Sequence, residues 1–405
     1  MAEKIKVAVV GAGISGLYIT HLLQKKGYDV TVFEAMPTIG GRLKEGYLRD
    51  FKVDLGGQWM HKTTSNGNPL SELIRVSGEE YFLDTKESQI VGMEGGNIYH
   101  QPHIIKEFFK YLRNTLLEKD LPLADTINAF SSSSFLKSYM EALLVDLGSY
   151  SSDFSTLKFI ELLQSDMLYG YMLKNRTMTN FLLSKFSLIQ NQKVLLSSPV
   201  QEIIYTPGHV DIICNKERFK FHKAIISVPI SQLQQDKIIF SPRLPDEKIA
   251  AFKKIGMGKG LKIFMLFKES LIGNFSFKHQ YAPYYIEQKM GNFYVIITIL
   301  MGCFADNYYK DKSNYLEGIL KELSEISGKN AEAIVEDTLV QDWSSEPYIE
   351  GTYSYPLVGI GNARKIAASP IDHTLFFIGE AMNTELAHGY IHGAMDTALK
   401  TSEMF

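Results

Sequence analysis

The sequence predicts an α/β protein of two domains. Three observations lead to this prediction. The chain opens with a strand, a glycine-rich turn, a helix and a second strand, all between residues 6 and 34. The apolar pattern is helical from Pro102 to about Lys193, and strand-like runs return from Val194 onward. With 405 residues, the chain is long enough for two domains and a sizeable core.

The opening strand and turn fit a site for phosphate groups. The apolar run 7–10 is typical of a buried parallel strand, and the turn after it matches G-x-G-x-x-G at Gly11, Gly13 and Gly16. In such a turn the first glycine permits a tight reversal and the second lets the backbone approach a pyrophosphate. The third lets the helix pack close to the strand. Ile14 and Ser15 begin the helix, whose N-terminal N–H groups attract phosphate.

An acidic residue follows at the place where a ribose is expected. The second strand, 30–33, ends on Glu34, eighteen residues after Gly16, and Ala35 comes next. A carboxylate there can accept hydrogen bonds from both hydroxyls of an adenosine ribose, and it disfavours a 2′-phosphate. Strand, turn, helix, strand and acid come in the required order, so the segment is predicted to bind a dinucleotide. An ordinary βαβ turn is the alternative.

A second glycine cluster decides which kind of dinucleotide is expected. It consists of Gly40-Gly41-Arg42 and, shortly after, Asp54-Leu55-Gly56-Gly57-Gln58-Trp59. A nicotinamide dehydrogenase has no use for such a cluster. The order of these motifs resembles the flavin-containing amine oxidases, which include monoamine oxidases, polyamine oxidases and flavin histone demethylases. The resemblance implies FAD as the cofactor, with Arg42 near its phosphates and the turn 56–59 near the isoalloxazine ring.

The residues after this cluster bear on the substrate. Met60-His61 follows Trp59, and Gly67-Asn68-Pro69 comes soon after, which resembles polyamine oxidases more than monoamine oxidases. The resemblance implies that Trp59 and His61 line the substrate tunnel. For His61, a loop histidine hydrogen-bonded to the backbone is the alternative.

The helical block from 102 to 193 carries no catalytic signature of its own. Its aromatic residues, such as Phe154, Tyr169 and Tyr171, are predicted to be core rather than ligand contacts. We interpret the block as the helical part of a substrate domain that is inserted into the first domain.

A lysine inside an apolar strand is the next candidate. Lys262 lies in the run 261–267, where a buried ammonium is costly without a partner. The segment 257–262 matches the family pattern M-G-x-x-x-K. The resemblance implies that this lysine holds a water against flavin N5 and assists the reaction of reduced flavin with oxygen. A side chain that reaches outward to solvent is one alternative, and Lys259 is a rival for the role.

Later segments complete the flavin site that the resemblance implies. Val200 would meet the adenine through its backbone, and Trp343 opens a W…G-x-Y-S segment that would lie over the flavin. Monoamine oxidases carry a flavin-bonding cysteine at the position of Thr352, so the FAD here is predicted to be non-covalent. Gly379-Glu380 resembles the family's F-x-G-E, with Glu380 against the ribityl or pyrophosphate part of FAD.

Two tyrosines are predicted to flank the amine. Tyr353 and Tyr390 match the family's two parallel aromatic residues in front of the flavin. Gly389, Tyr390 and Ile391 lead into a helix whose dipole would stabilise the anionic reduced ring. With Lys262, the two tyrosines form the predicted catalytic set. No acid–base pair is predicted, because a deprotonated amine needs none.

The resemblance covers the whole chain. It implies a Rossmann-like FAD-binding domain of residues 1–75, 194–240 and 365–405. The inserted substrate domain, of helices and a mixed sheet, would comprise 76–193 and 241–364. The implied reaction is amine oxidation: hydride passes from the carbon next to nitrogen to flavin N5, the imine hydrolyses, and O2 re-oxidises the flavin to give H2O2. The expected substrate is a polyamine or another primary or secondary amine. The alternatives are a flavin desaturase or porphyrinogen-oxidase-like enzyme, and a catalytically silent flavoprotein that binds a partner.

The composition limits the partners, the metal content and the cellular location that can be expected. A net charge of −3 is too near neutral to indicate a nucleic-acid or membrane partner. Cys214 and Cys303 have no metal-type spacing, so no metal is predicted. The longest apolar run, 293–305, is too short to cross a bilayer and is predicted to be a buried strand. No signal-peptide core precedes the first strand. The protein is therefore expected to be cytoplasmic and either a monomer or a homodimer.

Overall fold

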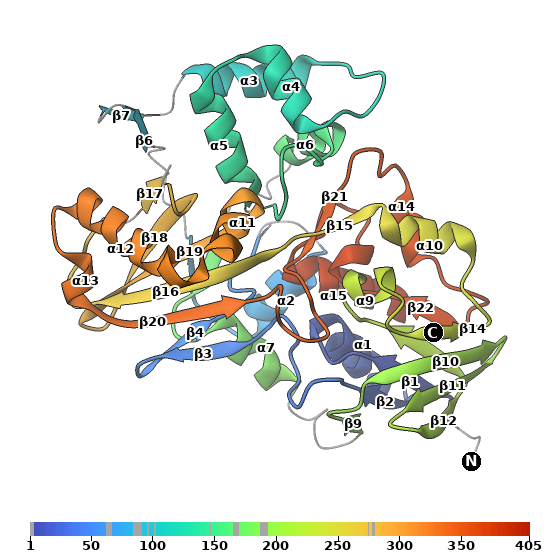
Figure 1. Cartoon of the computed structure of the whole chain (residues 1–405). Helices are drawn as coiled ribbons and strands as arrows, with labels where there is room; N and C mark the ends of the chain where they lie inside the picture. Colours follow the sequence, from blue (N-terminus) through green and yellow to red (C-terminus); the bar gives the residue numbers. More distant parts are fainter. Residues whose placement is uncertain are drawn as a thin grey trace.

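The structure is a computed structural model that describes residues 4–61, 67–83, 91–94, 97–100, 103–145, 147–164, 170–186, 193–273, 275–277 and 280–405. Figure 1 shows three groups of elements: a parallel sheet with its helices, an antiparallel sheet with its helices, and a cap of helices above them.

The first group is built on a five-stranded parallel sheet with the strand order β22-β13-β1-β2-β9. The central strand is β1, in which Val7 pairs with Lys223 on one side and with Val30 on the other. Valine side chains fit a strand that is buried on both faces, and Val7 and Val9 are fully buried. The strands are β1 (Lys6–Val10), β2 (Asp29–Phe33), β9 (Val194–Leu195), β13 (Lys223–Ile226) and β22 (Leu375–Phe377).

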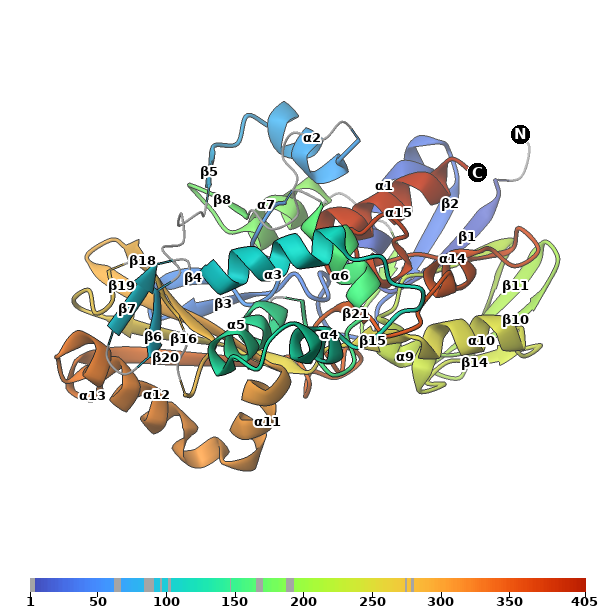
Figure 2. The same ribbon diagram turned by 90° about the horizontal axis from the view of Figure 1, so that it is seen from above.

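Two helices from opposite ends of the chain cover one face of this sheet. They are α1 (Ile14–Lys25) and α15 (Ile391–Ser402), which lie side by side in both views (Figures 1 and 2). Both contribute to one apolar cluster with Val7 and Val9. After α1, Gly27 adopts a left-handed φ of +89°, which glycine allows at little cost, and the chain turns into β2. The helices α2 (Pro69–Val76) and α7 (Met178–Lys185) pack into the same cluster.

The opposite face of the parallel sheet packs on a four-stranded sheet with the order β12-β11-β10-β14. Ala8 and Val10 share an apolar cluster with Ile203 and Ile212 of that sheet and with Phe252. The strands are β10 (Val200–Thr206), β11 (His209–Cys214), β12 (Glu217–Phe221) and β14 (Ile239–Ser241). The helices beside them are α9 (Ile230–Gln234), α10 (Asp246–Lys253) and α14 (Ala363–Ala368).

The second group is a five-stranded sheet with the order β17-β18-β19-β16-β20. Every pairing in it is antiparallel, where the sequence predicted a mixed sheet. The predicted strand 293–305 is also too long: β19 ends at Met301, and Gly302, with φ +56°, begins a helix. The strands are β16 (Gly260–Phe267), β17 (Phe275–Phe277), β18 (Tyr284–Met290), β19 (Phe293–Met301) and β20 (Val335–Asp342).

The two faces of this sheet bury side chains against different helices. Ile263 and Met265 of β16 pack with residues of the helices α11 (Gly302–Lys310), α12 (Lys312–Ser327) and α13 (Ala331–Ile334). Phe264 and Leu266 point to the other face and join a cluster with residues of the helical cap. The cap consists of α3 (His103–Asn114), α4 (Leu123–Phe130), α5 (Ser134–Val145) and α6 (Thr156–Leu163).

The predicted core aromatic residues of the helical block can be placed in part. Phe154 is buried in the cluster that joins the cap to the antiparallel sheet. Tyr171 is partly buried against the cluster of the parallel sheet. Tyr169 lies outside the described residues.

The remaining short elements connect these groups. They are β3 (Glu45–Leu48), β4 (Phe51–Asp54), β5 (Tyr81–Leu83), β6 (Val91–Glu94), β7 (Asn97–His100), β8 (Tyr171–Leu173), β15 (Ile255–Met257), β21 (Ser354–Pro356) and the 3-10 helix η2 (Glu380–Met382).

The predicted fold class is confirmed: a parallel sheet covered by helices is combined with a second sheet that carries its own helices. The exact domain boundaries stay a prediction. Within the described part of the chain, no helix has both the length and the apolar character needed to span a membrane.

Candidate active site

One large cavity runs between the parallel sheet and the antiparallel sheet. Its volume is about 950 Å³, at the upper end of the range of roughly 300–1,000 Å³ for small-molecule sites. With the exception of Gly16, every residue that the sequence proposed for the site lines this cavity. These residues are Gly11, Gly13, Ile14, Ser15, Glu34, Ala35, Gly41, Arg42, Gly56, Gly57, Gln58, Trp59, His61, Val200, Lys262, Trp343, Tyr353, Gly379, Glu380, Gly389, Tyr390 and Ile391.

Gly16 does not line the cavity; it lies where α1 packs against the glycine turn. A Cβ on Gly16 would lie 2.0 Å from the carbonyl oxygen of Gly11, so the helix can approach the strand only without a side chain here. A Cβ on Gly13 would meet nothing within 4 Å. The second glycine thus opens onto the cavity, and the third holds α1 against the turn.

The second glycine cluster packs directly on the first. The N–H of Gly40 donates to the carbonyl of Ala12 at 2.9 Å, and Gly13 and Gly40 form a parallel bridge. A Cβ on Gly41 would lie 3.3 Å from the Cα of Gly13. Two backbone segments without side chains therefore meet at the N-terminus of α1, which is the arrangement that a pyrophosphate needs.

Glu34 closes this end of the cavity. Its carboxylate accepts the backbone N–H of Ala12 at 2.6 Å and that of Met36 at 2.8 Å. Burial raises the pKa of Glu34, although these N–H groups oppose the shift. An ionised carboxylate has about four lone-pair sites, so two bonds leave it capacity to accept hydroxyl groups.

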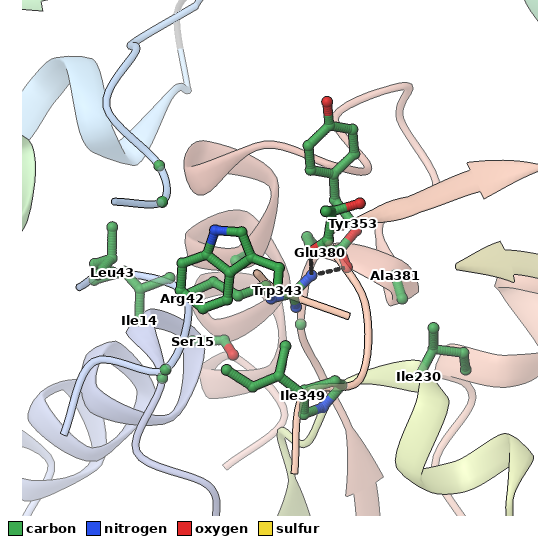
Figure 3. Close-up of a pocket in the computed structure, with 18 of the residues that line it drawn as sticks. Ile14, Ser15, Arg42, Leu43, Ile230, Trp343, Ile349, Tyr353, Glu380 and Ala381 are labelled. Atoms are coloured by element: carbon green, nitrogen blue, oxygen red, sulfur yellow. Dashed lines mark hydrogen bonds and ion pairs between the residues drawn. The ribbon is translucent and has the colours of Figure 1, made fainter. Parts of the chain in front are cut away.

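An ion pair lies at the middle of the cavity (Figure 3). Arg42 donates to Oε1 of Glu380 and to the carbonyl of Thr352, both at 2.8 Å. The other oxygen, Oε2, accepts the Ser354 hydroxyl at 2.7 Å and the Gly389 N–H at 2.8 Å. Burial raises the pKa of Glu380, but its cationic and hydrogen-bonding partners lower it more, so the carboxyl is ionised at neutral pH.

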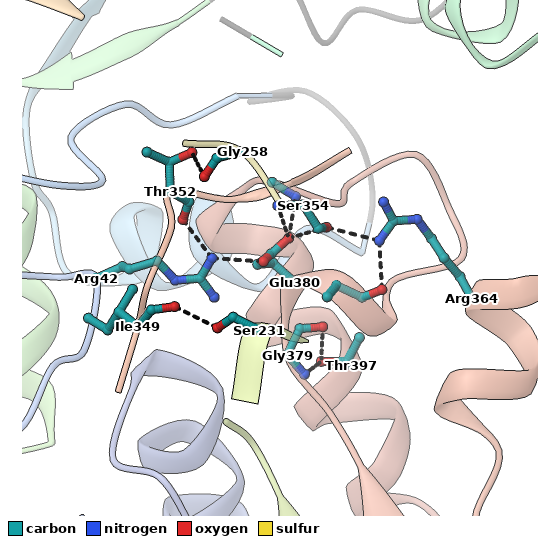
Figure 4. A network of polar contacts seen from close by, with 12 residues as sticks. Arg42, Ser231, Gly258, Ile349, Thr352, Ser354, Arg364, Gly379, Glu380 and Thr397 are labelled. Atoms are coloured by element: carbon teal, nitrogen blue, oxygen red, sulfur yellow. Dashed lines mark hydrogen bonds and ion pairs between the residues drawn. The ribbon is translucent and has the colours of Figure 1, made fainter. Parts of the chain in front are cut away.

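Arg364 belongs to the same network, and the sequence analysis did not find it. Its guanidinium donates to the Ser354 hydroxyl at 2.9 Å and to the carbonyl of Ala381 at 2.6 Å (Figure 4). Burial lowers the pKa of Arg364 to about 10, opposed by the charge of Glu380. An arginine in the short, otherwise largely apolar helix α14 was the available signal. Partners ten and seventeen residues away could not be assigned from spacing.

The turn at residues 56–57 lines the cavity and packs against residues from three other segments. A Cβ on Gly56 would lie 1.9 Å from the carbonyl oxygen of Arg42 and 2.9 Å from the ring of Trp343. The indole N–H of Trp343 donates to the carbonyl of Leu55 at 3.1 Å. Gly57 lies against Ile391, the first residue of α15. The N-terminus of this second helix is therefore aimed at the cavity beside the glycine turn.

Lys262 is buried in the cavity wall, as one reading of the sequence proposed. It is only 3% exposed, and its Nζ donates to the carbonyl of Asp54 at 2.8 Å and to Oε1 of Gln58. The rings of Trp59 and Phe264 lie 5.0 and 4.9 Å from it. These acceptors and ring faces stabilise a charged ammonium. Lys259 is exposed and does not line the cavity, so the rival position is disfavoured.

The predicted aromatic residues come together at the far end. Tyr353 directs its hydroxyl to the carbonyl of Val145 at 3.3 Å and to Sδ of Met301 at 3.2 Å. Its ring packs against Gly389, the residue before Tyr390. The Tyr390 ring lies edge to face with His61, with 4.5 Å between ring centroids. His61 thus contributes its ring to the cavity, while its carbonyl accepts the side-chain amide of Asn68.

A further set of lining residues was not predicted. These side chains come from α5, from the turn after it and from the cavity-facing side of the antiparallel sheet, and they are apolar or aromatic. In the sequence they are indistinguishable from core residues, because a side chain that lines an apolar cavity has the same character as one that fills it. They are Tyr139, Leu143, Leu147, Tyr284, Ile286, Ile299 and Met301.

The chain has relatives of known name. Residues 14–403 match the family described as flavin containing amine oxidoreductase. Polyamine oxidase 3 of Oryza sativa subsp. japonica is 25% identical, over 98% of this chain and 88% of that relative. Putrescine oxidase bound to putrescine shares the fold with a TM-score of 0.84 at 17% identity, covering 99% of this chain and 98% of that one. Cyclohexylamine oxidase from Brevibacterium oxydans gives a TM-score of 0.84 at 18% identity, with 99% and 98% covered.

Proposed function

The chain belongs to the family of flavin-containing amine oxidoreductases and is an FAD-dependent amine oxidase, and from this premise we propose which residues carry the reaction. The resemblance that the motifs predicted is thereby confirmed. The observation that supports the assignment of residues is a single one: a phosphate-type glycine cradle and an aromatic compartment with a buried lysine belong to the same cavity.

The residues at the cradle end fit FAD. Gly13 leaves open space beside the N-terminus of α1 for the pyrophosphate, and Glu34 retains lone pairs for the ribose hydroxyls. Arg42 offers its charge to the phosphates while Glu380 holds its guanidinium in place. The backbone of Val200 is assigned to the adenine. The start of α15 at Ile391 would present its positive dipole end to the flavin ring.

When bound, FAD supplies the two-electron oxidation of the C–H bond next to the amine nitrogen and passes the electrons to O2, giving H2O2. The residues of the chain bind the amine, orient it and shield the reacting atoms from water. Tyr353 and Tyr390 are proposed to guide the amine with their ring faces. Trp59 and His61 would border the path of the substrate. Lys262 is proposed to hold positive charge, through Gln58 and Asp54, where oxygen is reduced. The imine product then hydrolyses in water.

The amine itself is a primary or secondary amine. The polyamine favoured by the sequence finds support in relatives that are named polyamine oxidases. Location in the cytoplasm, the use of O2 as acceptor, and a monomeric or dimeric state stay predictions.

Anaerobic mixing with amines tests the function. The yellow purified protein is expected to lose its absorbance when an oxidisable amine is added, and H2O2 should appear once air is admitted. A desaturase of apolar substrates would leave the absorbance unchanged with every amine. A silent flavoprotein would likewise keep its absorbance with every amine, and it would produce no H2O2 from any of them. Either outcome contradicts amine oxidation.

The flavin is expected to leave the protein on acid denaturation. Thr352 lines the cavity, but its hydroxyl donates to the carbonyl of Gly258 at 3.1 Å, and an alcohol of threonine forms no thioether. After precipitation in acid and centrifugation, the yellow colour should be in the supernatant, with the chromatographic retention of free FAD. Colour that stays with the pellet would show a covalent bond elsewhere.

A further inference from the structure

The far end of the cavity is an apolar compartment. Its walls are Leu143 and Leu147 from the cap, Ile286 and Ile299 from the antiparallel sheet, and the ring of Tyr353. All of these side chains belong to, or pack against, one apolar cluster that joins the cap to the sheet. The compartment is therefore a gap in a continuous hydrophobic core, with the catalytic aromatic residues at one side of it.

The carboxylates of the described cavity lining are held away from the apolar compartment. Among the described lining residues they are Glu34, Glu350 and Glu380. Glu34 is bound to backbone N–H groups at the cradle, and Glu380 is paired with Arg42 at the middle of the cavity. Oε1 of Glu350 faces Lys237 at 3.7 Å, and its buried Oε2 has no hydrogen-bond partner among the described residues. This residue lies on the segment that contacts α9 through the carbonyl of Ile349. Each has a cationic or N–H partner that is not in the apolar compartment.

The surroundings of the compartment disfavour a second positive charge. Tyr139, on its wall, is 7% exposed, and burial alone raises its pKa to about 12. The buried Lys262 already contributes a cation to the cavity. An ammonium placed among leucine and isoleucine side chains loses its hydration without gaining an anion, which is costly.

We propose that the preferred substrate is a monoamine with an aliphatic or aromatic body, which packs in the compartment formed by Leu143, Leu147, Ile286 and Ile299, rather than a polyamine. This rests on the proposed amine oxidation and specifies it. The one amino group reacts beside Tyr353 and Tyr390, and the affinity comes from apolar area that is removed from water. It reverses the preference for polyamines that the His61 segment suggested and that the relatives named polyamine oxidases support.

Two matched amines test the proposal on the wild-type holoenzyme. Hexylamine and hexane-1,6-diamine have the same carbon chain and differ in one terminal amino group. The kcat/KM for hexylamine is expected to exceed that for hexane-1,6-diamine by at least about 100-fold, mainly through KM. In the series butylamine, pentylamine, hexylamine, each methylene is expected to raise kcat/KM about fourfold.

A charge placed in the wall should reverse the preference. Ile286→Glu supplies a carboxylate, which the described walls of the compartment do not contain, and Ile286→Gln is its neutral control of similar size. The glutamate variant is expected to improve the diamine relative to hexylamine by at least about tenfold, whereas the glutamine variant lowers hexylamine turnover without favouring the diamine. FAD content and thermal midpoint report whether each variant is folded, and the wild-type substrate pair does not depend on either.

The outcomes separate the two levels of inference. If hexane-1,6-diamine or spermidine reduces the flavin with a kcat/KM equal to or above that of hexylamine, the monoamine proposal is wrong while amine oxidation stands. If no amine in the panel reduces the flavin, the proposed function itself fails. A flat kcat/KM across the alkylamine series would likewise overturn the role given to the apolar walls.

Discussion

Replacing Lys262 by methionine is expected to slow the re-oxidation of the reduced enzyme by O2 roughly 100-fold, the scale observed when one preorganised electrostatic group is removed. The ammonium is held in the cavity wall by Asp54 and Gln58 and is almost fully buried. In such surroundings a fixed charge stabilises negative charge on oxygen more than it does in water. Methionine keeps most of the volume and removes the charge. FAD should stay bound.

Stopped-flow mixing of the reduced enzyme with O2 measures this step apart from amine oxidation. The rate of flavin reduction by amine should change by less than about tenfold, because a positive charge is not needed to accept a neutral amine. The matched control is Lys259→Met, three positions away on an exposed site outside the cavity, which should leave both half-reactions unchanged. Equal re-oxidation rates in the wild type and in Lys262→Met would remove this lysine from the mechanism.

Two alanine substitutions in the same glycine turn are expected to fail in different ways. In Gly16→Ala the new Cβ would lie 2.0 Å from the carbonyl oxygen of Gly11 and 2.7 Å from the hydroxyl of Ser227, so α1 must move away from the sheet. Overpacking of this kind costs about 1–3 kcal/mol, and more where backbone is hit. The apoprotein should therefore melt several degrees lower or fail to accumulate in soluble form.

Gly13→Ala is the contrasting case. Gly13 has φ −70°, which alanine adopts freely, and its Cβ would meet no atom within 4 Å. The thermal midpoint of the apoprotein should therefore be unchanged. The methyl group would instead occupy the space proposed for the pyrophosphate and weaken FAD binding by about 5–150-fold, the equivalent of about 1–3 kcal/mol. FAD titration of the two apoproteins separates the effects. Normal FAD affinity in Gly13→Ala would show that the phosphates do not bind at this turn.

The glycine motifs made much of the cradle predictable. Gly11, Gly16 and Gly40 have conformational or contact requirements that few other residues meet, so their spacing carries information about geometry. Lys262 was predictable for the opposite reason: a charge within an apolar strand calls for a partner. In both cases a residue did not fit the local pattern of the sequence, and this mismatch indicated a functional position.

The apolar compartment could not be predicted, because Leu143, Ile286 and Ile299 have the residue types of an ordinary core. Whether such side chains meet or leave a gap depends on the packing of α5 over the antiparallel sheet. That packing brings together residues more than a hundred positions apart. The role of Arg364 could not be predicted for a related reason, since its partners Ser354 and Ala381 lie on separate elements. The predicted strand 293–305 is too long because its apolar pattern continues past Gly302, the residue at which the strand has ended.

The pairing of α1 with α15 has a consequence for how the protein is made. The turn that cradles the phosphates leaves the ribosome early, but Glu380 and the helix beginning at Ile391 are about 370 residues behind it. At 5–20 residues per second that is a delay of roughly 20–70 s. During this interval the sheet lacks its β22 edge, and the first helix lacks the neighbour that covers it. Capture of the cofactor must therefore follow synthesis of nearly the whole chain, and a nascent chain waits with that apolar surface open to chaperones.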